Sequence, residues 1–422
     1  MDIQIILLIL VCLFSFSIGF IVFGTFFRRW IHKKQYTQID HLKSIYQPWV
    51  DEALSGNPQR ISELQRVVGE DGFGREALEQ IVCEKCMSGD KAIFSLIQEV
   101  GFIRLYEKKL ISQRLSIPMR ARAADRLGRM QSKESVDLLF QVLKEESDKT
   151  ELANSIIKAM ALIGSEKALE AIITIFPLIL KKEVITPKNG EMILLMFAPL
   201  YREHLVRVLH HFQHSGERLC VIVTLDALSR SAVTEDMVAV AMEMLESEDA
   251  EIRVRCLRLI ANANLQKVQM TLHEIKLHLH DAQWFIRMQA IEVARRFFCE
   301  KSLGEMVLLL RDAHWQVRRA AAGTIVSLGD ESLETIIGVI EGEDTYAKEA
   351  ICEAIHLEGY VQQLVNHLTE SSLLFNSSAR ILFYMHSIGL ASSLKETALT
   401  HPDGEIRQNL HLLIHPQGGD ND

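Results

Sequence analysis

Two short clusters in this chain contain residue types that can bind a metal or exchange electrons. Cys83 and Cys86 form a single Cys-x-x-Cys sequence, and His210, His211 and His214 place two imidazoles one helical turn apart. A structural zinc site would need a second pair of ligands, and a thiol redox motif would need a βαβ setting. Neither accompanies these residues, so we expect two cysteines on one helix face and histidines on the surface.

No catalytic signature occurs elsewhere in the chain. The sequence has no phosphate-binding glycine loop, no nucleophile elbow and no His-Glu-x-x-His motif. The seven cysteines are odd in number and scattered, which is typical of small buried side chains in a reducing compartment. We therefore expect a binding protein and no enzyme, with no cofactor, no metal and no small-molecule substrate.

The most informative stretch covers residues 281–329, where one pattern occurs twice. Asp-Ala-x-Trp-x-Ile-Arg starts at Asp281, and Asp-Ala-x-Trp-x-Val-Arg starts at Asp312, 31 residues later. A period of this length is typical of helical repeat arrays. In both copies apolar residues recur at offsets that place them on one face of a first helix. The two stripes are Ile286, Ala290, Ala294 and Phe297, and Val317, Ala321, Ile325 and Leu328.

The same template fits other parts of the chain. Two further stripes begin at Met119 and at Ile252. An arginine directly follows the first stripe position in most of the units, whereas Ala153, Ala347 and Ser378 occupy that position elsewhere. The recurring arginines are Arg120, Arg218, Arg253, Arg287, Arg318 and Arg407.

The segment from His401 to Arg407 reads His-Pro-Asp-Gly-Glu-Ile-Arg. It is close to the Asp-Pro-Asp-x-x-Val-Arg that opens the first helix of the bacterial HEAT repeat, and the chain as a whole resembles HEAT-repeat proteins. This resemblance implies an all-α fold, a right-handed α-solenoid of HEAT-like helix pairs. We expect one N-terminal transmembrane helix in addition.

Residues 3–27 contain no charged side chain. At about 1.5 Å per residue such a helix exceeds the roughly 30 Å hydrocarbon core of a bilayer. A cleaved signal peptide is the alternative, but Asp2 precedes the segment where a signal peptide has a basic residue. Basic residues follow the segment directly, which predicts an N-terminus outside the cytoplasmic (inner) membrane and the array in the cytoplasm.

The expected organisation has five parts. They are a transmembrane helix at 3–27, a basic juxtamembrane segment at 28–50 that ends near Pro48, a divergent helical cap at 51–115, a HEAT-repeat array at 116–415 and a flexible tail at 416–422. Within the array, residues 181–190 contain Pro187 and Asn189-Gly190 and are expected to form a longer loop between two helices.

Positive charge is concentrated in the first third of the chain. Residues 1–133 contain 19 Lys and Arg against 14 Asp and Glu, whereas the remainder contains 27 against 41. The acidic array disfavours nucleic acid as a partner. The basic side chains could lie on a solvated face, or they could contact anionic lipid headgroups or an acidic partner. The candidates for lipid contact are Arg28, Arg29, Lys33, Lys34, Arg122, Arg126 and Arg129.

Candidate partner-binding residues come from the two tandem copies. Trp284 and Trp315 occupy equivalent positions at the start of adjacent first helices, and Arg287 and Arg318 follow three residues later. Trp and Arg dominate the energetics of protein interfaces, so these four residues could anchor a partner. Alternatively, the tryptophans cover the seam between repeats, while each arginine binds an aspartate of an adjoining repeat in an internal ladder.

The complete plan resembles membrane-anchored HEAT-repeat proteins of bacteria, which are often encoded beside membrane glycosyltransferases. The resemblance implies a membrane-tethered cytoplasmic scaffold or adaptor that binds a membrane-associated protein partner through its HEAT-repeat surface, with a link to an envelope glycosyltransferase system. A lipid-headgroup or signalling adaptor is the alternative. A bilin-lyase-like enzyme is a remote one, because nothing in the sequence singles out a tetrapyrrole pocket.

The charge distribution around residues 3–27 makes the topology testable. A reporter fused after Asp422 should be active in the cytoplasm, because the basic residues follow the apolar segment and none precedes it. Activity of a periplasmic reporter at this position, or a mature chain that lacks the first 27 residues, would show that the predicted orientation or the retained anchor is wrong.

Overall fold

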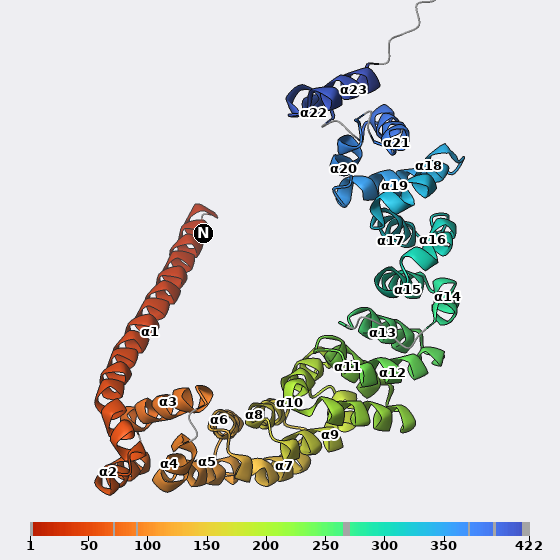
Figure 1. Ribbon diagram of the computed structural model, residues 1–422. Coiled ribbons are helices and arrows are strands. Elements are labelled where there is room, and N and C mark those ends of the chain that lie inside the picture. The colour runs from red at the N-terminus through yellow and green to blue at the C-terminus, as the bar shows by residue number, and fades with distance from the viewer. Residues whose placement is uncertain are drawn as a thin grey trace, which may run out of the picture. The chain divides into compact units, whose positions relative to one another are not determined.

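The computed structural model describes residues 3–70, 72–89, 92–264, 271–369, 372–390 and 394–415, and it is helical throughout these ranges without a strand. Most side chains before Lys33 lie outside this description. The chain divides into two compact units, Met1–Phe197 and Ala198–Asp422, and each is considered by itself. Figure 1 shows that, apart from the long helix α1, both units consist of helices that follow one another along the chain.

The first unit begins with the helix α1, Ile3–Leu54. Its C-terminal half belongs to the fold, because Ile39, Val50 and Ala53 are buried and the helix packs against α3. Pro48 lies inside α1, so the expected juxtamembrane segment continues as helix and does not end there. The helices that follow are α2 Pro58–Gly69, α3 Phe73–Met87, α4 Ala92–Val100 and α5 Phe102–Ile111.

The predicted membrane span at 3–27 falls largely on side chains outside the described residues. Within the described part of the chain, no helix has the length together with the apolar character that crossing a bilayer requires.

Repeating helix pairs continue the first unit. They comprise α6 Ile117–Arg129, η1 Lys133–Ser135, α7 Val136–Glu145, α8 Thr150–Ile163 and α9 Glu166–Lys181. The next helix, α10, spans Pro187–His214, so it begins in the first unit and ends in the second, with a kink at Tyr201 two residues after Pro199. The predicted loop at 181–190 is therefore shorter than expected, since Pro187 starts a helix, as proline often does at a first helical position.

The second unit repeats one arrangement several times. The first helices α11, α13, α15, α17 and α19 pack in sequence order, each against the next. Second helices lie beside them (Figure 1). The elements are α11 Arg218–Ser229, α12 Glu235–Glu243, η2 Met244–Glu246, α13 Ala250–Ala261, α14 Leu272–Leu279, α15 Trp284–Phe297, η3 Glu300–Ser302, α16 Leu303–Leu309, α17 Trp315–Val326, η4 Gly329–Ser332, α18 Leu333–Glu341, α19 Thr345–Leu357, α20 Val361–Asn366, α21 Phe375–Ser387, α22 Leu394–Thr400 and α23 Gly404–Ile414. This succession of stacked helix pairs is an α-solenoid.

The apolar stripes predicted for α15 and α17 form the core between neighbouring pairs. Their first three positions are completely buried in both helices, and only the last, Phe297 and Leu328, are half-buried. Small residues sit where the helices come together, and larger ones fill the space beside them. The residues without exposed surface are Ile286, Ala290, Ala294, Val317, Ala321 and Ile325.

The stripe predicted from Met119 is wrong at its first position. Met119 is 53% exposed, whereas Arg120 is among the most deeply buried side chains of the described residues. Helix α6 turns Arg120 inward because its guanidinium pairs with Glu146, as described below. Ile252, the corresponding first position in α13, is half-buried.

Helices α6 and α8 approach each other closely at Gly128. A Cβ atom added to this glycine would lie 2.5 Å from the Cα and 2.9 Å from the Cβ of Ala159. No side chain fits at such distances, and the neighbouring atoms belong to backbone that cannot move aside cheaply. The absence of a side chain at Gly128 therefore sets the spacing of these two repeats.

Gly128→Ala should lower the free energy of unfolding by about 2–3 kcal/mol, because the added methyl forces α6 and α8 apart. Gly338→Ala is the matched control: this glycine also lies inside a helix, α18, but no atom lies within 4 Å of the added Cβ. The control should be neutral or stabilising by up to about 1 kcal/mol. Equal melting temperatures for both variants would contradict the close approach.

Candidate partner-binding surface

An Asp–Arg ladder connects adjacent repeats of the second unit. Its aspartates are Asp249, Asp281 and Asp312, and each accepts the backbone N–H two residues further on at 2.8 Å. Asp249 is the N-cap of α13, whereas Asp281 and Asp312 bind the amides of Gln283 and His314, the residues directly before α15 and α17. The other oxygen of each carboxylate faces an arginine of the preceding repeat. The pairs are Arg218 with Asp249, Arg253 with Asp281 and Arg287 with Asp312.

Arg287 shows how the ladder holds two repeats together. Its Nε and Nη2 donate to the two carboxylate oxygens of Asp312, both at 2.7 Å. Its Nη1 donates to the carbonyl oxygens of Asp281 and Ala282, at 2.8 and 3.1 Å. Burial alone would raise the pKa of Asp312, but the hydrogen bonds from Arg287 and from the His314 N–H lower it. The prediction that Arg287 reaches an aspartate of the adjoining repeat is confirmed.

The same prediction is wrong for Arg318. Its Nη1 makes the equivalent bonds to the carbonyl oxygens of Asp312 and Ala313, at 2.8 and 3.2 Å. The guanidinium carbon then lies 4.9 Å from the ring centroid of Tyr346. The aspartate of the next repeat, Asp344, instead caps its own helix α19. Arg318 thus binds its own loop but no carboxylate among the described residues.

The two tryptophans have different surroundings although their sequence positions are equivalent. Trp284 is half-buried and stacks on His314 of the next repeat, with ring centroids 4.0 Å apart and an interplanar angle of 2°. Trp315 is 55% exposed. Trp284 therefore covers the seam between two repeats, as the internal-ladder alternative predicts. Trp315, by contrast, presents its ring to solvent.

Tyr346 is a further residue of this surface that the sequence analysis did not identify. It follows Trp315 by 31 residues, lies at the start of α19 and is 64% exposed. The repeat period would have identified it, because Trp284, Trp315 and Tyr346 are equally spaced. We refer to these three residues at the starts of α15, α17 and α19 as the aromatic row.

The first unit contains a more deeply buried counterpart of the ladder. Arg120 donates from Nη1 and Nη2 to the carboxylate of Glu146, at 2.8 and 2.7 Å, and from Nε to the carbonyl of Leu110 at 2.7 Å. These hydrogen bonds from Arg120, with others from Lys149 and Gln113, lower the pKa of Glu146 to about 2. The repeat pattern identified Arg120, but no sequence spacing identified Glu146 as its partner.

The basic side chains predicted on α6 are paired with carboxylates. Arg122 contacts Glu76 at 3.1 Å, Arg126 pairs with Glu79, and Arg129 contacts Asp125 at 2.8 Å. This pairing reduces the positive charge that the three arginines present. Of the other candidates for lipid contact, Lys33 and Lys34 are exposed, whereas the side chains of Arg28 and Arg29 lie outside the described residues.

Cationic side chains also line a pocket of about 650 Å³ between α3, α5 and α6. Its lining includes Arg75, Lys109 and Arg122, with Tyr106 among them. The Lys109 ammonium lies 5.4 Å from the centroid of the Tyr106 ring. Burial, together with nearby Arg75 and Arg122, lowers the pKa of Lys109. Two carboxylates line the same pocket, Glu76 paired with Arg122, and Glu79 paired with Arg126 and with the Tyr106 hydroxyl.

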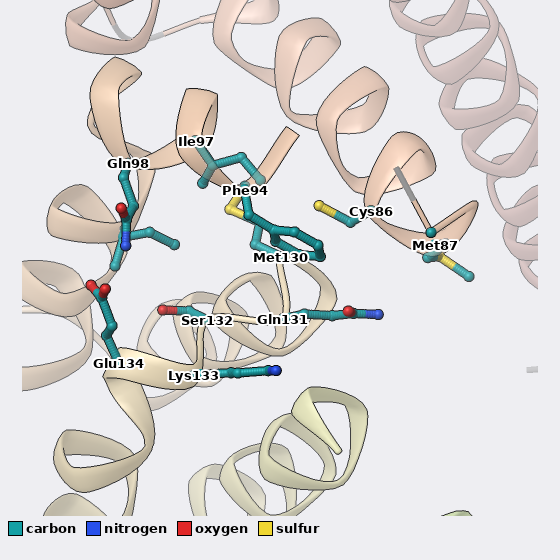
Figure 2. Close-up of a pocket in the computed structure, with 12 residues that line it drawn as sticks. Cys86, Met87, Phe94, Ile97, Gln98, Met130, Gln131, Ser132, Lys133 and Glu134 are labelled. Carbon is teal, nitrogen blue, oxygen red and sulfur yellow. The ribbon is translucent and has the colours of Figure 1, made fainter. Parts of the chain in front are cut away.

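A second pocket, of about 630 Å³, has an apolar floor (Figure 2). Cys86, Phe94, Ile97 and Met130 contribute to this floor, and Figure 2 shows the thiol of Cys86 directed toward the Phe94 ring. Burial also raises the pKa of Cys83 to about 12, so its thiol remains protonated. Both cysteines of the Cys-x-x-Cys sequence are buried on α3, as predicted.

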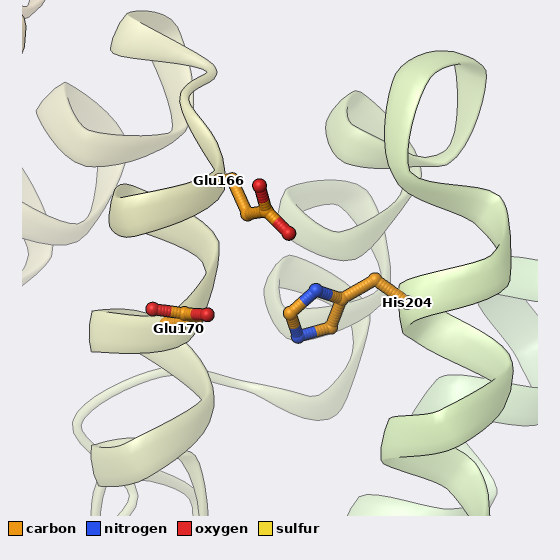
Figure 3. A group of neighbouring side chains, drawn as sticks. All are labelled: Glu166, Glu170 and His204. Carbon is orange, nitrogen blue, oxygen red and sulfur yellow. The ribbon is translucent and has the colours of Figure 1, made fainter.

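Figure 3 shows Glu166 and Glu170 on successive turns of α9, together with His204 of α10. Two exposed carboxylates one turn apart are common on helix surfaces, and His204 belongs to the other compact unit. We assign no metal site to these residues. The sequence places the imidazoles of His210 and His214 one helical turn apart, and in the structure their ring centroids are 6.4 Å from each other.

The comparison of Arg287 with Arg318 yields a test of the ladder. Arg287→Gln should lower the free energy of unfolding by about 2–4 kcal/mol, because the mostly buried carboxylate of Asp312 loses its partner. Arg318→Gln removes the same charge and the same pair of carbonyl contacts but orphans no carboxylate, so its cost should stay below about 1 kcal/mol. Chemical denaturation of both variants measures the difference, and equal losses would exclude the ladder as a stabilising element.

Comparisons with known proteins identify no family for this chain. No family profile matches it, and no curated protein is similar enough to match. Among solved structures, the karyopherin Kap121p bound to Pho4p is 14% identical, with a TM-score of 0.47 over 85% of this chain and 45% of Kap121p. Kap95p in a study with RanGDP is 11% identical, with a TM-score of 0.43 over 85% of this chain and 58% of the other. Human deoxyhypusine hydroxylase is 16% identical, with a TM-score of 0.25 over 74% and 99%. The chain spans about half the length of these karyopherins, and such low scores support no statement about partner or activity.

Proposed function

We propose that this protein is a membrane-tethered scaffold whose α-solenoid binds a protein partner in the cytoplasm. The observation that carries the proposal is the aromatic row, in which Trp315 and Tyr346 are more than half exposed on adjacent repeats. Exposed large aromatic side chains in register are unusual on a surface that serves no partner.

The composition of this surface fits a protein partner. Trp, Tyr and Arg are the residue types most often found at binding hot spots. The aromatic row consists of Trp and Tyr residues, and the guanidinium of Arg318 lies beside it, next to Tyr346. Helix α17 holds Trp315 at its first turn, and the buried positions Val317 and Ala321 fix that helix against its neighbours. The anchors are thus presented on a rigid support, which reduces the entropy lost on binding. Arg287, by contrast, is engaged by Asp312 and supports the surface from within.

The membrane part of the proposal rests on the sequence of residues 3–27 and on the basic residues that follow it. An N-terminal anchor would confine the solenoid to the inner face of the membrane and raise its effective concentration near membrane partners. The resemblance to membrane-anchored HEAT-repeat proteins makes envelope glycosyltransferases the first partner class to test.

Trp315→Ala should weaken binding of the partner about tenfold or more without lowering the melting temperature appreciably, because this exposed ring contributes little to the fold. Cross-linking of the full chain in native membranes would identify the partner, whose affinity is then measured for the wild type and the variant. Leu308→Ala is the control, since Leu308 is 60% exposed but lies on the second helix α16.

Two outcomes would contradict the proposal. If Trp315→Ala and Leu308→Ala bind the partner equally well, the aromatic row is not the interface. If Trp315→Ala loses stability in proportion to its loss of binding, the ring has a structural role.

An anionic lipid headgroup is the second candidate ligand. The pocket that contains Lys109 supports this candidate, because Arg75 and Arg122 lie near Lys109 while the carboxylates of the lining, Glu76 and Glu79, are each paired with an arginine. A membrane-tethered chain would carry this pocket close to the bilayer surface, where a phosphate could enter it. In this case the first unit would bind lipid, and the partner-binding surface of the second unit would be independent of it.

Reconstitution into nanodiscs tests the lipid candidate. Anionic lipid should raise the melting temperature of the wild-type chain relative to neutral lipid, because a ligand that binds only the folded state stabilises it. Lys109→Gln should abolish the increase, whereas Lys108→Gln, at the exposed neighbouring position, should retain it. An increase that persists in Lys109→Gln would exclude this pocket as the headgroup site.

A further inference from the structure

We propose that Arg318 binds a carboxylate of the partner, in the position that an aspartate of the chain itself occupies at the preceding steps of the Asp–Arg ladder. The inference rests on the proposed function, and it specifies the partner as a protein segment that carries an Asp or Glu side chain. Arg318 lies on α17, and its guanidinium carbon is 4.9 Å from the ring centroid of Tyr346 at the start of α19.

Two of the ladder arginines, Arg253 and Arg287, have a common geometry, which Arg318 shares in part. In Arg253, Arg287 and Arg318, Nη1 donates to the carbonyl oxygens six and five residues earlier in the chain, at 2.8–3.2 Å. In Arg253 and Arg287, the Nε and Nη2 edge then donates to an aspartate of the next repeat at 2.7–3.1 Å. The loop therefore holds each guanidinium in the orientation that receives a carboxylate.

At Arg318 this receiving edge is open. Within the described residues, neither Nε nor Nη2 of Arg318 has a hydrogen-bond partner. Glu343 follows Asp312 by 31 residues and so occupies the equivalent position in the next repeat. Its side chain is exposed, and it forms no ion pair with Arg318. Asp344 accepts the Ala347 N–H as the cap of α19 and lies near Arg311. A preorganised arginine fork without a carboxylate is thus available to a partner.

The surroundings of Arg318 favour a single carboxylate over a phosphate. A guanidinium edge with two parallel donors matches the two oxygens of one carboxylate. Glu343 and Asp344 lie close in the chain to Tyr346, and their negative charges would oppose a dianion more strongly than a monoanion. The side chains of Trp315 and Tyr346, which precede and follow Arg318 in the sequence, are more than half exposed. An aromatic or apolar side chain next to the partner's acidic residue would find these rings.

The experiment uses the full chain with its four tryptophans replaced by 5-fluorotryptophan and follows their fluorine NMR signals. The probe is the dipeptide acetyl-Asp-Phe-amide, and Trp315→Phe assigns the relevant signal. We expect a saturable shift of the Trp315 signal with a Kd of about 0.1–10 mM, as befits one ion pair and one aromatic contact. Acetyl-Asn-Phe-amide should bind at least about fivefold more weakly, because it cannot accept a charge-assisted fork.

Arg318→Gln should weaken binding of the Asp dipeptide to the level of the Asn dipeptide. Arg319→Gln is the matched control, because it removes the same charge from an exposed neighbouring position of α17 and should leave the affinity unchanged. Equal affinities of the two dipeptides, no saturable shift, or equal weakening by both substitutions would overturn the proposal.

The outcomes for this site and for the proposed function can be separated. If Trp315→Ala loses the natural partner while Arg318→Gln binds both partner and dipeptide as the wild type does, the aromatic row is the interface and the carboxylate site is wrong. If the dipeptide binds in an Arg318-dependent way while Trp315→Ala retains the partner, the carboxylate site stands and the proposed interface fails.

Discussion

Each helix pair of this chain has two apolar faces, and one pair cannot bury both. The second face is covered only by the next pair, so every repeat depends on its neighbours. Ile286 and Val317 illustrate this dependence, because each begins a stripe whose first three positions have no exposed surface once α15 and α17 are stacked. Close approach is then limited by side-chain size, and Gly128 marks a place where even a methyl group does not fit.

Polar contacts fix the register of this stacking. The hydrophobic stripes tolerate small sliding movements, whereas a bidentate pair such as Arg287 with Asp312 does not, because both hydrogen bonds are directional. The same pair satisfies the start of α17 through the His314 N–H. In the first unit, the ion pair of Arg120 with Glu146 has the same role, and its arginine is more deeply buried than Arg287. At Arg318 the ladder has no aspartate, but the guanidinium keeps its bonds to the loop carbonyls. The guanidinium edge that binds aspartate in Arg287 therefore has no carboxylate at Arg318, which lies beside the exposed side chain of Tyr346.

The two units also differ in charge, and the structure changes how that difference should be interpreted. Counting residues suggests a basic first third of the chain, but Arg122, Arg126 and Arg129 each have a carboxylate partner. What remains distinctive is the pocket containing Lys109, where burial, together with nearby Arg75 and Arg122, lowers the pKa of the Lys109 ammonium. A count of charges in the sequence cannot locate such a pocket, because it depends on which charges neutralise one another in space.

The sequence by itself determined the helical repeat and much of its core. A stripe such as Ile286, Ala290 and Ala294 is readable because helix geometry is local, and the period of 31 residues is visible because each repeat solves the same packing problem. The prediction that Met119 begins a buried stripe is wrong, because the pattern of apolar residues cannot show that Arg120 is buried there instead, paired with Glu146. Membrane insertion, orientation and partner remain predictions from the sequence.

Only the tertiary structure decided the roles of the candidate site residues. Trp284 and Trp315 are equivalent in sequence, yet one stacks on His314 and the other is exposed. Arg287 and Arg318 are equivalent as well, yet only Arg287 has an aspartate within reach. The physical reason is that the partner of each ladder arginine belongs to the next repeat, 25–31 residues away in the sequence. Small differences in loop geometry between repeats therefore decide whether an aspartate lies within hydrogen-bonding distance of the arginine. Local patterns specify the helix, and the contact between repeats specifies the site.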